Sequence, residues 1–156
     1  MALKVGDKAP DFTMYDLDKK PRTLKEFLGK KLVMVFYPGA FTGVCTKEVC
    51  SFRDSLAAFN TMDARVIAAS TDSPFSNKAF ADQNRLTFTV LSDVTKEASK
   101  QYTGLYDAFA GIPGYVTAKR SVFVLDATGT VKYAWISENP GAEPNYDEVR
   151  NAVSSF

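Results

Sequence analysis

The residues with the most reactive side chains are two cysteines, Cys45 and Cys50, which stand five positions apart in a chain of 156 residues. The chain contains no histidine. Without histidine, Ser-His-Asp and Cys-His catalysis, imidazole bases and histidine-ligated metals are all excluded. Two cysteines are also too few for a zinc site made of four thiolates. The chemistry that remains is that of thiols, carboxylates, hydroxyls, lysines and arginines.

Cys45 lies where an apolar run passes into a helical pattern. The run Leu32–Tyr37 is continuous and ends at Pro38-Gly39, which is typical of a strand buried on both faces. We expect Cys45 in the first turn of the following helix, where the positive end of the helix dipole favours a thiolate. Thr42 can donate a hydrogen bond to the sulfur or to an oxygen bound beside it, and Pro38 can shield the sulfur from water.

The spacing Pro-x-x-x-Thr-x-x-Cys, formed by Pro38, Thr42 and Cys45, resembles the active-site signature of the peroxiredoxins, the thiol peroxidases. The resemblance covers essentially the whole chain and includes Ala9–Phe12 and the arginine-bearing segment Arg120–Asp126. It implies that Cys45 attacks a peroxide and becomes a sulfenic acid, the first and reversible oxidation state of the thiol. It further implies a thioredoxin-like fold, no cofactor, and a thioredoxin-like or small-thiol reductant as partner.

The resemblance also assigns roles to residues around Cys45. The guanidinium of Arg120 would stabilise the thiolate and the charge that builds on the leaving oxygen. Glu48 is near enough to orient Arg120, and the backbone N–H of Val44 or Cys45 could hold the peroxide. The predicted catalytic residues are Cys45, Cys50, Thr42 and Arg120, and the predicted pocket residues are Pro38, Val44 and Glu48.

Cys50 stands where the bacterioferritin-comigratory, or Q-type, peroxiredoxins carry the resolving cysteine, so the resemblance implies an intramolecular disulfide with Cys45. On an ideal helix the two Cα atoms would be roughly 8–9 Å apart, whereas a disulfide needs less than about 7 Å. The bond therefore requires the start of the helix to unwind. Gly39 and Gly43 make such unwinding easier.

Three alternatives stay open at this point. The loop 39–44 and the segment Asn139–Gly141 look more like the one-cysteine and AhpE-type branches, in which Cys50 would be structural. A thioredoxin-type disulfide oxidoreductase is a second alternative, although it needs Cys-x-x-Cys and four residues intervene here. A non-catalytic domain with incidental thiols is the third.

The elements that must position these residues follow from hydrophobic periodicity. A hairpin is expected at Phe12–Asp16 and Arg22–Thr23, and a later one at Ser121–Asp126 and Val131–Ile136. The other predicted strands are Leu32–Tyr37, Arg65–Ser70 and Thr87–Leu91. The predicted helices are Thr42–Asn60, Phe75–Asn84, Thr95–Tyr102 with Thr95 as N-cap, and Asn145–Ser155, and Gly104–Lys119 is expected to be a loop. This order predicts an α/β thioredoxin-like domain over residues 1–156, with an N-terminal hairpin extension and helices on both faces of a mixed central sheet.

The overall charge and the chain ends set the expected surroundings. Nineteen basic and 18 acidic residues leave a net charge of +1, with no basic block to attract nucleic acid or an anionic membrane. The first residues lack the apolar core of a signal peptide. We therefore expect a cytoplasmic protein with reduced cysteines. The sequence leaves open whether the chain is a monomer, a homodimer or part of a larger ring.

Overall fold

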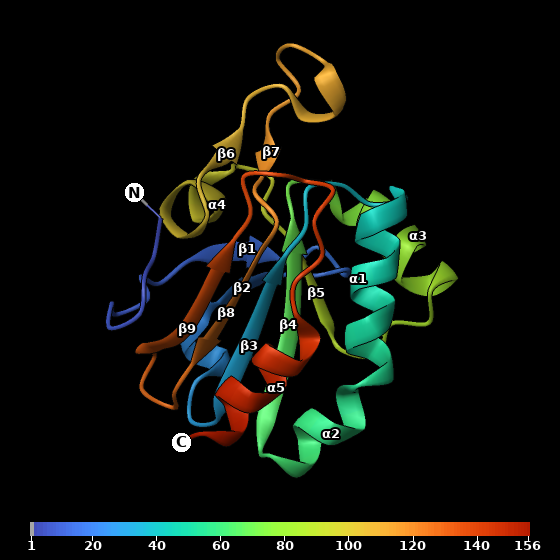
Figure 1. Ribbon diagram of the computed structural model, residues 1–156. Coiled ribbons are helices and arrows are strands. Elements are labelled where there is room, and N and C mark those ends of the chain that lie inside the picture. The colour runs from blue at the N-terminus through green and yellow to red at the C-terminus, as the bar shows by residue number, and fades with distance from the viewer. Residues whose placement is uncertain (1) are drawn as a thin grey trace.

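The computed structural model describes residues 2–156 and shows a seven-stranded sheet in the order β2-β1-β5-β4-β3-β8-β9 (Figure 1). Its strands are β1 (Thr13–Tyr15), β2 (Pro21–Thr23), β3 (Lys31–Phe36), β4 (Ala64–Ser70), β5 (Thr89–Ser92), β8 (Ser121–Leu125) and β9 (Val131–Ile136). The central strand β3 runs parallel to β4 and antiparallel to β8. The predicted mixed sheet and both predicted hairpins are confirmed.

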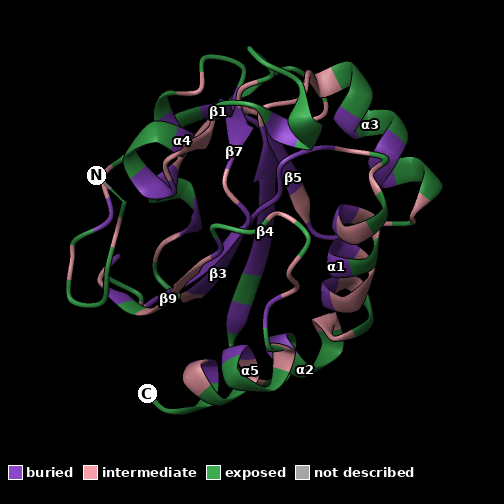
Figure 2. Cartoon of the chain, turned by 45° about the horizontal axis from the view of Figure 1, so that its top comes forward, coloured by how far each residue is buried: buried purple, intermediate pink, exposed green. Residues whose placement is uncertain are grey.

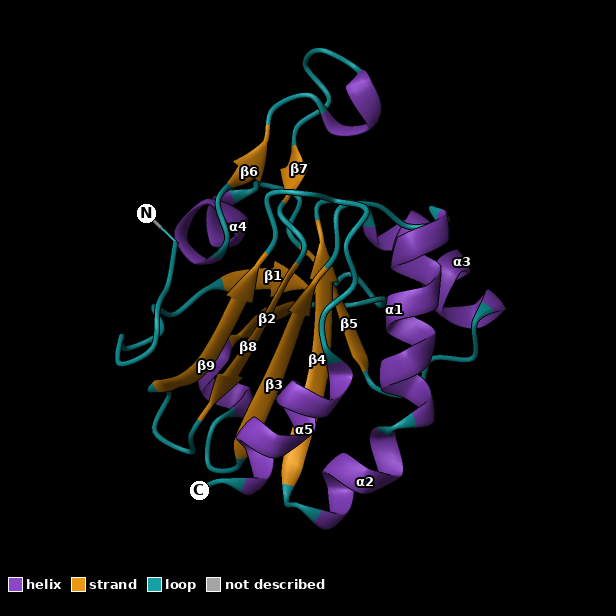
Figure 3. Cartoon of the chain, in the orientation of Figure 1, coloured by secondary structure: helices purple, strands orange, loops and turns teal. Residues whose placement is uncertain are grey.

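Helices cover both faces of this sheet (Figure 3). The α-helices are α1 (Gly43–Asp54), α2 (Leu56–Thr61), α3 (Pro74–Gln83), α4 (Glu97–Tyr102) and α5 (Tyr146–Ser154), and η1 (Leu24–Phe27) is a short 3-10 helix. The apolar side chains of α1, α2, α3 and α5 share one core cluster, and those of α4 and η1 belong to a second cluster. Within residues 2–156, no helix has the length and apolar character that a membrane crossing needs.

The two clusters explain why β3 reads as a continuous apolar run. Val33 and Val35 point into the first cluster, whereas Leu32, Met34 and Phe36 point into the second. All five side chains are at most 1% exposed, and the central strands are the most deeply buried part of the fold (Figure 2). A strand that is covered on both faces has no position for a polar side chain.

The helix expected over Thr42–Asn60 is in fact two helices, so this prediction was wrong in its extent. The first helix ends before Ser55, whose φ of −94° and ψ of 0° depart from helical values. Serine is a weak helix former, and the Ser55 hydroxyl accepts a hydrogen bond from Arg150 of α5 at 3.4 Å. Both helices still bury apolar side chains, because Phe52 and Phe59 are each 1% exposed.

Two further expectations need correction. Thr95 is not the N-cap of α4, because Lys96 takes that position with a left-handed φ of 64°. The buried carboxylate of Asp93 accepts the backbone N–H of Ser99 at 2.7 Å, and the Thr95 hydroxyl accepts the N–H of Glu97 at 3.3 Å, so both side chains cap the first turn. The segment Gly104–Lys119 is also more than a loop. It contains the antiparallel strands β6 (Leu105–Tyr106) and β7 (Thr117–Ala118) and the 3-10 turn η2 (Phe109–Gly111).

A buried polar cluster lies at the sheet edge from which the chain enters α1. Asn77 of α3 accepts a hydrogen bond from the Tyr37 hydroxyl at 2.5 Å and donates to the hydroxyls of Ser70 and Ser92 at 3.0 and 2.8 Å. Burial raises the pKa of Tyr37, which keeps its hydroxyl protonated as a donor. Asn77 therefore joins α3 to the ends of β3, β4 and β5.

Replacing Asn77 with Ala is expected to lower the free energy of unfolding by about 2–4 kcal/mol, because three buried hydroxyls lose a partner. Urea unfolding followed by circular dichroism measures this change. The matched control is Asn60→Ala on the exposed side of α2, which is expected to change the stability by less than about 0.5 kcal/mol. Equal stabilities of the two variants would show that the cluster does not anchor α3.

Candidate active site

The turn between β3 and α1 places Cys45 in the first turn of α1, beyond the carboxyl end of β3. Thr42 is the N-cap, with an extended backbone (φ −88°, ψ 153°), and Cys45 is the third residue of the helix. The exposed fraction of Cys45 is 0%. The N–H groups of the first helical turn have no partner within the helix, so they can interact with a bound anion or oxygen. The helix-start position predicted for Cys45 is confirmed.

Hydrogen bonds fix the shape of the turn before the helix. The Ala40 N–H donates to Asp72 at 2.8 Å, and the Thr42 hydroxyl donates to the carbonyl oxygen of Gly39 at 2.8 Å. In this structure the Thr42 hydroxyl therefore contacts the backbone of the turn, where we had expected it to donate to the sulfur or to a bound oxygen. Phe41 has a left-handed φ of 65° and packs edge-on against Phe80, with ring centroids 5.3 Å apart.

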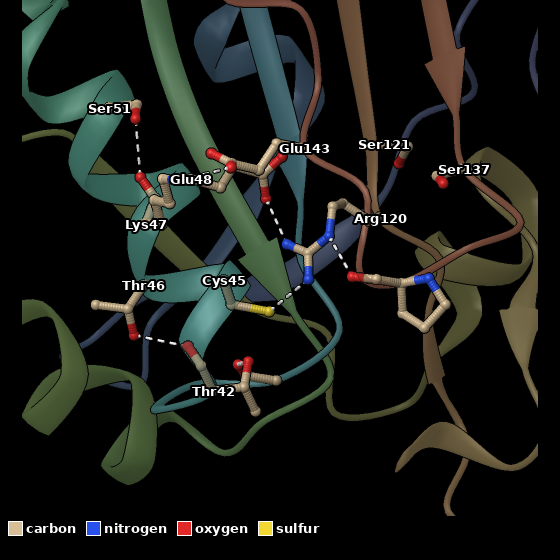
Figure 4. A network of polar contacts seen from close by, with 12 residues as sticks. Thr42, Cys45, Thr46, Lys47, Glu48, Ser51, Arg120, Ser121, Ser137 and Glu143 are labelled. Carbon is tan, nitrogen blue, oxygen red and sulfur yellow. Dashed lines mark hydrogen bonds and ion pairs between the residues drawn. The ribbon is translucent and has the colours of Figure 1, made fainter. Parts of the chain in front are cut away.

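Arg120 stands just before β8, whose start lies beside the end of β3, and its side chain reaches Cys45 (Figure 4). The Arg120 side chain is only 1% exposed. Its Nη2 donates to the Cys45 sulfur at 3.1 Å, and its Nη1 donates to Oε1 of Glu48 at 2.9 Å. Its Nε donates to the carbonyl oxygen of Pro140 at 3.0 Å. The fork of donors on one guanidinium is thus divided among a thiol, a carboxylate and a backbone carbonyl.

The backbone of Arg120 is held as firmly as its side chain. Arg120 stands directly before β8, and its carbonyl accepts the N–H of Ser137, just after β9, at 2.9 Å. Its own N–H donates to the Tyr106 hydroxyl at 3.3 Å, and that hydroxyl donates to the Ser137 carbonyl at 2.6 Å. Tyr106 therefore connects the small β6-β7 sheet to the residue that contacts the thiol.

The electrostatics of this buried cluster are dominated by the guanidinium. Burial acts to lower the pKa of Arg120, but Glu48 and Cys45 outweigh it and raise that pKa. Burial raises the pKa of Glu48 to about 8, although Arg120 opposes the rise. Oε2 of Glu48 is buried and has no hydrogen-bond partner among residues 2–156, which fits a carboxyl that is not easily ionised. Arg120 is therefore the permanent charge beside Cys45.

The remaining predicted residues differ in how near they come to this cluster. Pro38 is buried in the turn, and Val44 is half-buried in the first turn of α1. Cys50 is half-buried further along α1, and both cysteines are free thiols. The Cys50 thiol donates to Oδ1 of Asn84 at 3.5 Å. The structure thus gathers Cys45, Glu48 and Arg120 into one contact network and leaves Cys50 outside it.

Several residues that surround the turn were not among the predicted site residues, although the sequence left open whether Tyr106, Phe109 and Tyr115 line a peroxide pocket or a dimer contact. A Cβ atom on Gly39 would lie 3.4 Å from Phe109 and 3.7 Å from the Tyr115 hydroxyl, so both rings close over the turn. Tyr106 and Pro140, the latter through its carbonyl, contact Arg120 as described above. A loop rich in aromatic residues was the only signal for Tyr106, Phe109 and Tyr115, and nothing in a sequence marks a single backbone carbonyl.

The arrangement favours nucleophilic chemistry at sulfur. Within residues 2–156, no group of three or more cysteine, aspartate and glutamate side chains is placed to hold a metal ion. A thiol that accepts a hydrogen bond from a buried cation is stabilised as a thiolate, which is the reactive form. When the sulfur attacks another molecule, the same cation and the N–H groups of the helix start can stabilise negative charge on an oxygen that departs as the leaving group.

Replacing Glu48 with Gln is expected to remove a pH dependence from the stability of the fold. The pKa of Glu48 rises from an ordinary 4.5 to about 8 on folding, so between these values the folded chain holds a proton that the unfolded chain has lost. The stabilisation is complete below the lower value and is lost as the pH rises through the higher one.

Urea unfolding at several pH values tests this, with Cys45→Ser as the background so that this thiol does not titrate. The stability of the chain that retains Glu48, relative to the Glu48→Gln variant, should fall as the pH rises over that range. A stability difference between the two chains that stays flat over that range would mean that Arg120 keeps Glu48 ionised throughout.

Comparison with known proteins agrees with the geometry of the site. Residues 5–134 match the model of the AhpC/TSA family. The chain is 42% identical to the chloroplastic peroxiredoxin Q of Populus jackii over 97% of its length and 68% of the relative's. For the Gentiana triflora peroxiredoxin Q the identity is also 42%, over 81% of this chain and 56% of the relative.

A solved structure resembles the fold over nearly all of both chains. The peroxidoxin BcpB of Mycobacterium tuberculosis superimposes with a TM-score of 0.85 at 31% identity, covering 99% of this chain and 98% of the other. The curated relatives extend further than this chain, which spans from a little over half to about three quarters of their length. The chain belongs to the AhpC/TSA family, the thioredoxin-fold peroxiredoxins, and is a thiol-dependent peroxidase.

Proposed function

We propose that this chain reduces hydrogen peroxide and organic hydroperoxides with Cys45 as the nucleophile. The thiolate attacks the terminal oxygen of the hydroperoxide, the O–O bond breaks, and the other oxygen leaves as hydroxide or alkoxide and takes up a proton. Cys45 becomes a sulfenic acid. The observation that carries the proposal is the buried contact of 3.1 Å between the Cys45 sulfur and Nη2 of Arg120.

Arg120 acts on both partners of this step. Its Nη2 would stabilise the attacking thiolate before the reaction and the negative charge that develops on the leaving oxygen during it. Glu48 and Pro140 hold the other two donor groups at 2.9 and 3.0 Å, so the guanidinium needs no reorientation. Thr42, Pro38 and Val44 form the turn at which the peroxide would bind.

We propose that Cys50 completes the cycle by attacking the sulfenic sulfur. A disulfide forms and the sulfenic oxygen leaves as water, after which a thioredoxin-like dithiol reduces the disulfide by exchange. The disulfide requires α1 to unwind, because helical geometry separates the two Cα atoms by roughly 8–9 Å. Gly43 is the first residue of α1, and a Cβ atom there would meet no other atom within 4 Å. Neighbouring side chains therefore do not hold this glycine in its helical conformation, which favours unwinding.

A one-cysteine cycle is the competing proposal, and the hydrogen bond from Cys50 to Asn84 supports it, because that contact would also suit a packed structural thiol. In this cycle a second thiol, such as a small-molecule thiol, reduces the sulfenic acid directly. In either cycle the reductant is a soluble thiol, and a cytoplasmic location would supply both the peroxide and the reductant.

Replacing Arg120 with Met is expected to slow the reaction of Cys45 with peroxide by about 10²-fold, the usual effect of losing one donor to a developing oxyanion. Stopped-flow kinetics with hydrogen peroxide measure this rate. Arg120→Lys is the matched control, since it keeps the positive charge but loses the planar set of donors. Its rate should fall between the rates of the parent and the Met variant. A rate in the Met variant within twofold of the parent would mean that the charge comes from elsewhere.

Replacing Cys50 with Ser is expected to leave the first attack intact and to stop the cycle at the sulfenic acid. Intact mass spectrometry after one equivalent of peroxide should show the parent lighter by two hydrogens and the variant heavier by one oxygen. The Cys45→Ser variant should show neither change. Thioredoxin-driven turnover of the Cys50→Ser variant at the parent's rate would establish the one-cysteine cycle instead.

A further inference from the structure

The C-cap residue of α3, Asn84, holds Cys50 in a defined hydrogen bond. The Cys50 thiol donates to Oδ1 of Asn84 at 3.5 Å, and Nδ2 of the same amide donates to the Phe80 carbonyl at 2.9 Å. Because the nitrogen of the amide is bonded to the helix, its oxygen is the group that faces the sulfur. Arg53, three residues after Cys50, donates to the Asn84 carbonyl at 2.7 Å.

This contact suits only one protonation state of Cys50. An amide oxygen accepts a hydrogen bond from a thiol but has no proton to offer a thiolate, and the thiolate is the form that attacks a sulfenic acid. Arg53, the next charged residue along α1, lies near the sulfur. The hydrogen bond with Asp54, and in smaller part the Cys50 sulfur, raise the pKa of Arg53. The hydrogen bond with Asn84 therefore favours the thiol of Cys50 over the attacking thiolate.

The same end of α3 holds α1 on both sides of Cys45. Phe41, before the helix, packs on Phe80, whose exposed fraction is 0%. Cys50 and Arg53, after Cys45, are bonded to Asn84. The helix start cannot unwind far enough to bring Cys50 to Cys45 until the contact of Cys50 with Asn84 breaks. The contact of Arg53 with the Asn84 backbone can persist and limit how far the unwinding extends.

We propose that Asn84 is a positioning residue that keeps Cys50 a neutral thiol until α1 unwinds, and that it thereby sets the rate at which the sulfenic acid becomes a disulfide. This inference rests on the proposed two-cysteine cycle. While Cys50 is held, a second hydroperoxide can react with the sulfenic sulfur, transferring one oxygen to give the sulfinic acid and leaving as an alcohol or water. Asn84 thus favours over-oxidation at high peroxide.

The protonation effect is tested on Cys50 alone, in the Cys45→Ser background, where it is the sole thiol. Its alkylation by iodoacetamide is followed across pH. Asn84→Ala is expected to react about three to five times faster at neutral pH, the effect of losing one weak hydrogen bond. Asn84→Asp is expected to react more slowly than the parent, because a carboxylate opposes the thiolate while still accepting from the thiol.

The two variants separate a protonation effect from loosened packing. Loosening would accelerate alkylation in both variants and leave the pH midpoint of the reaction unchanged, whereas the proposal requires the midpoint to move down with Ala and up with Asp. Asp82→Ala, at the same end of α3, is the control and should behave as the parent. Equal rates in the parent and Asn84→Ala, or acceleration by Asp, would overturn the assignment.

The effect on the cycle is measured in the chain with both cysteines by acid quench and mass spectrometry after peroxide. Asn84→Ala should form the disulfide about three to five times faster, accumulate less sulfinic acid, and react with peroxide at the parent's rate. An unchanged rate of disulfide formation would overturn the role of Asn84 in resolution. A parent that forms no disulfide at all would instead refute the two-cysteine cycle, and the alkylation result would still stand by itself.

Discussion

A guanidinium that is withdrawn from water needs a partner for each of its donor groups, and Arg120 finds them on two separate segments of the chain. Its partners are Cys45 and Glu48 on α1 and the carbonyl of Pro140 in the connection to α5. A buried charge with a missing partner is strongly destabilising. The position of α1 against the sheet, the path of the chain after β9 and the surroundings of the thiol are therefore determined together.

This arrangement has a consequence for motion. In the proposed cycle, attack on a peroxide uses Cys45 in contact with Arg120, whereas a disulfide with Cys50 would need the first turns of α1 to open, which breaks that contact. The two states cannot coexist in one chain. Oxidation of the sulfur changes their balance, because a neutral sulfenic acid interacts less strongly with the guanidinium than a thiolate does. The chemical step can thus release the helix whose folded form made the step fast.

Features that depend on consecutive residues could be predicted from the sequence, whereas features that depend on contacts between distant residues could not. Apolar runs such as Leu32–Tyr37 predicted their strands well, because burial on two faces leaves a continuous signal in consecutive residues. The end of α1 at Ser55 and the cap of α4 by Asp93 could not be predicted, since each depends on a partner distant in the sequence or on a tight turn. The grouping of Cys45 with Arg120 came from resemblance to a family.

The contacts that no pattern revealed are those that use backbone atoms or an amide. Tyr106 reaches the N–H of Arg120, and Asn84 reaches Cys50, across separations of 14 and 34 residues. Both residues bear on the site through a neighbour, so neither type nor spacing distinguishes them from ordinary polar residues. A chain without histidine adjusts the reactivity of its thiols by such contacts: a permanent cation faces Cys45, and a neutral acceptor faces Cys50. Two identical side chains on one helix therefore meet different partners, and in the proposed cycle the contact at Cys50 must break before that residue attacks Cys45.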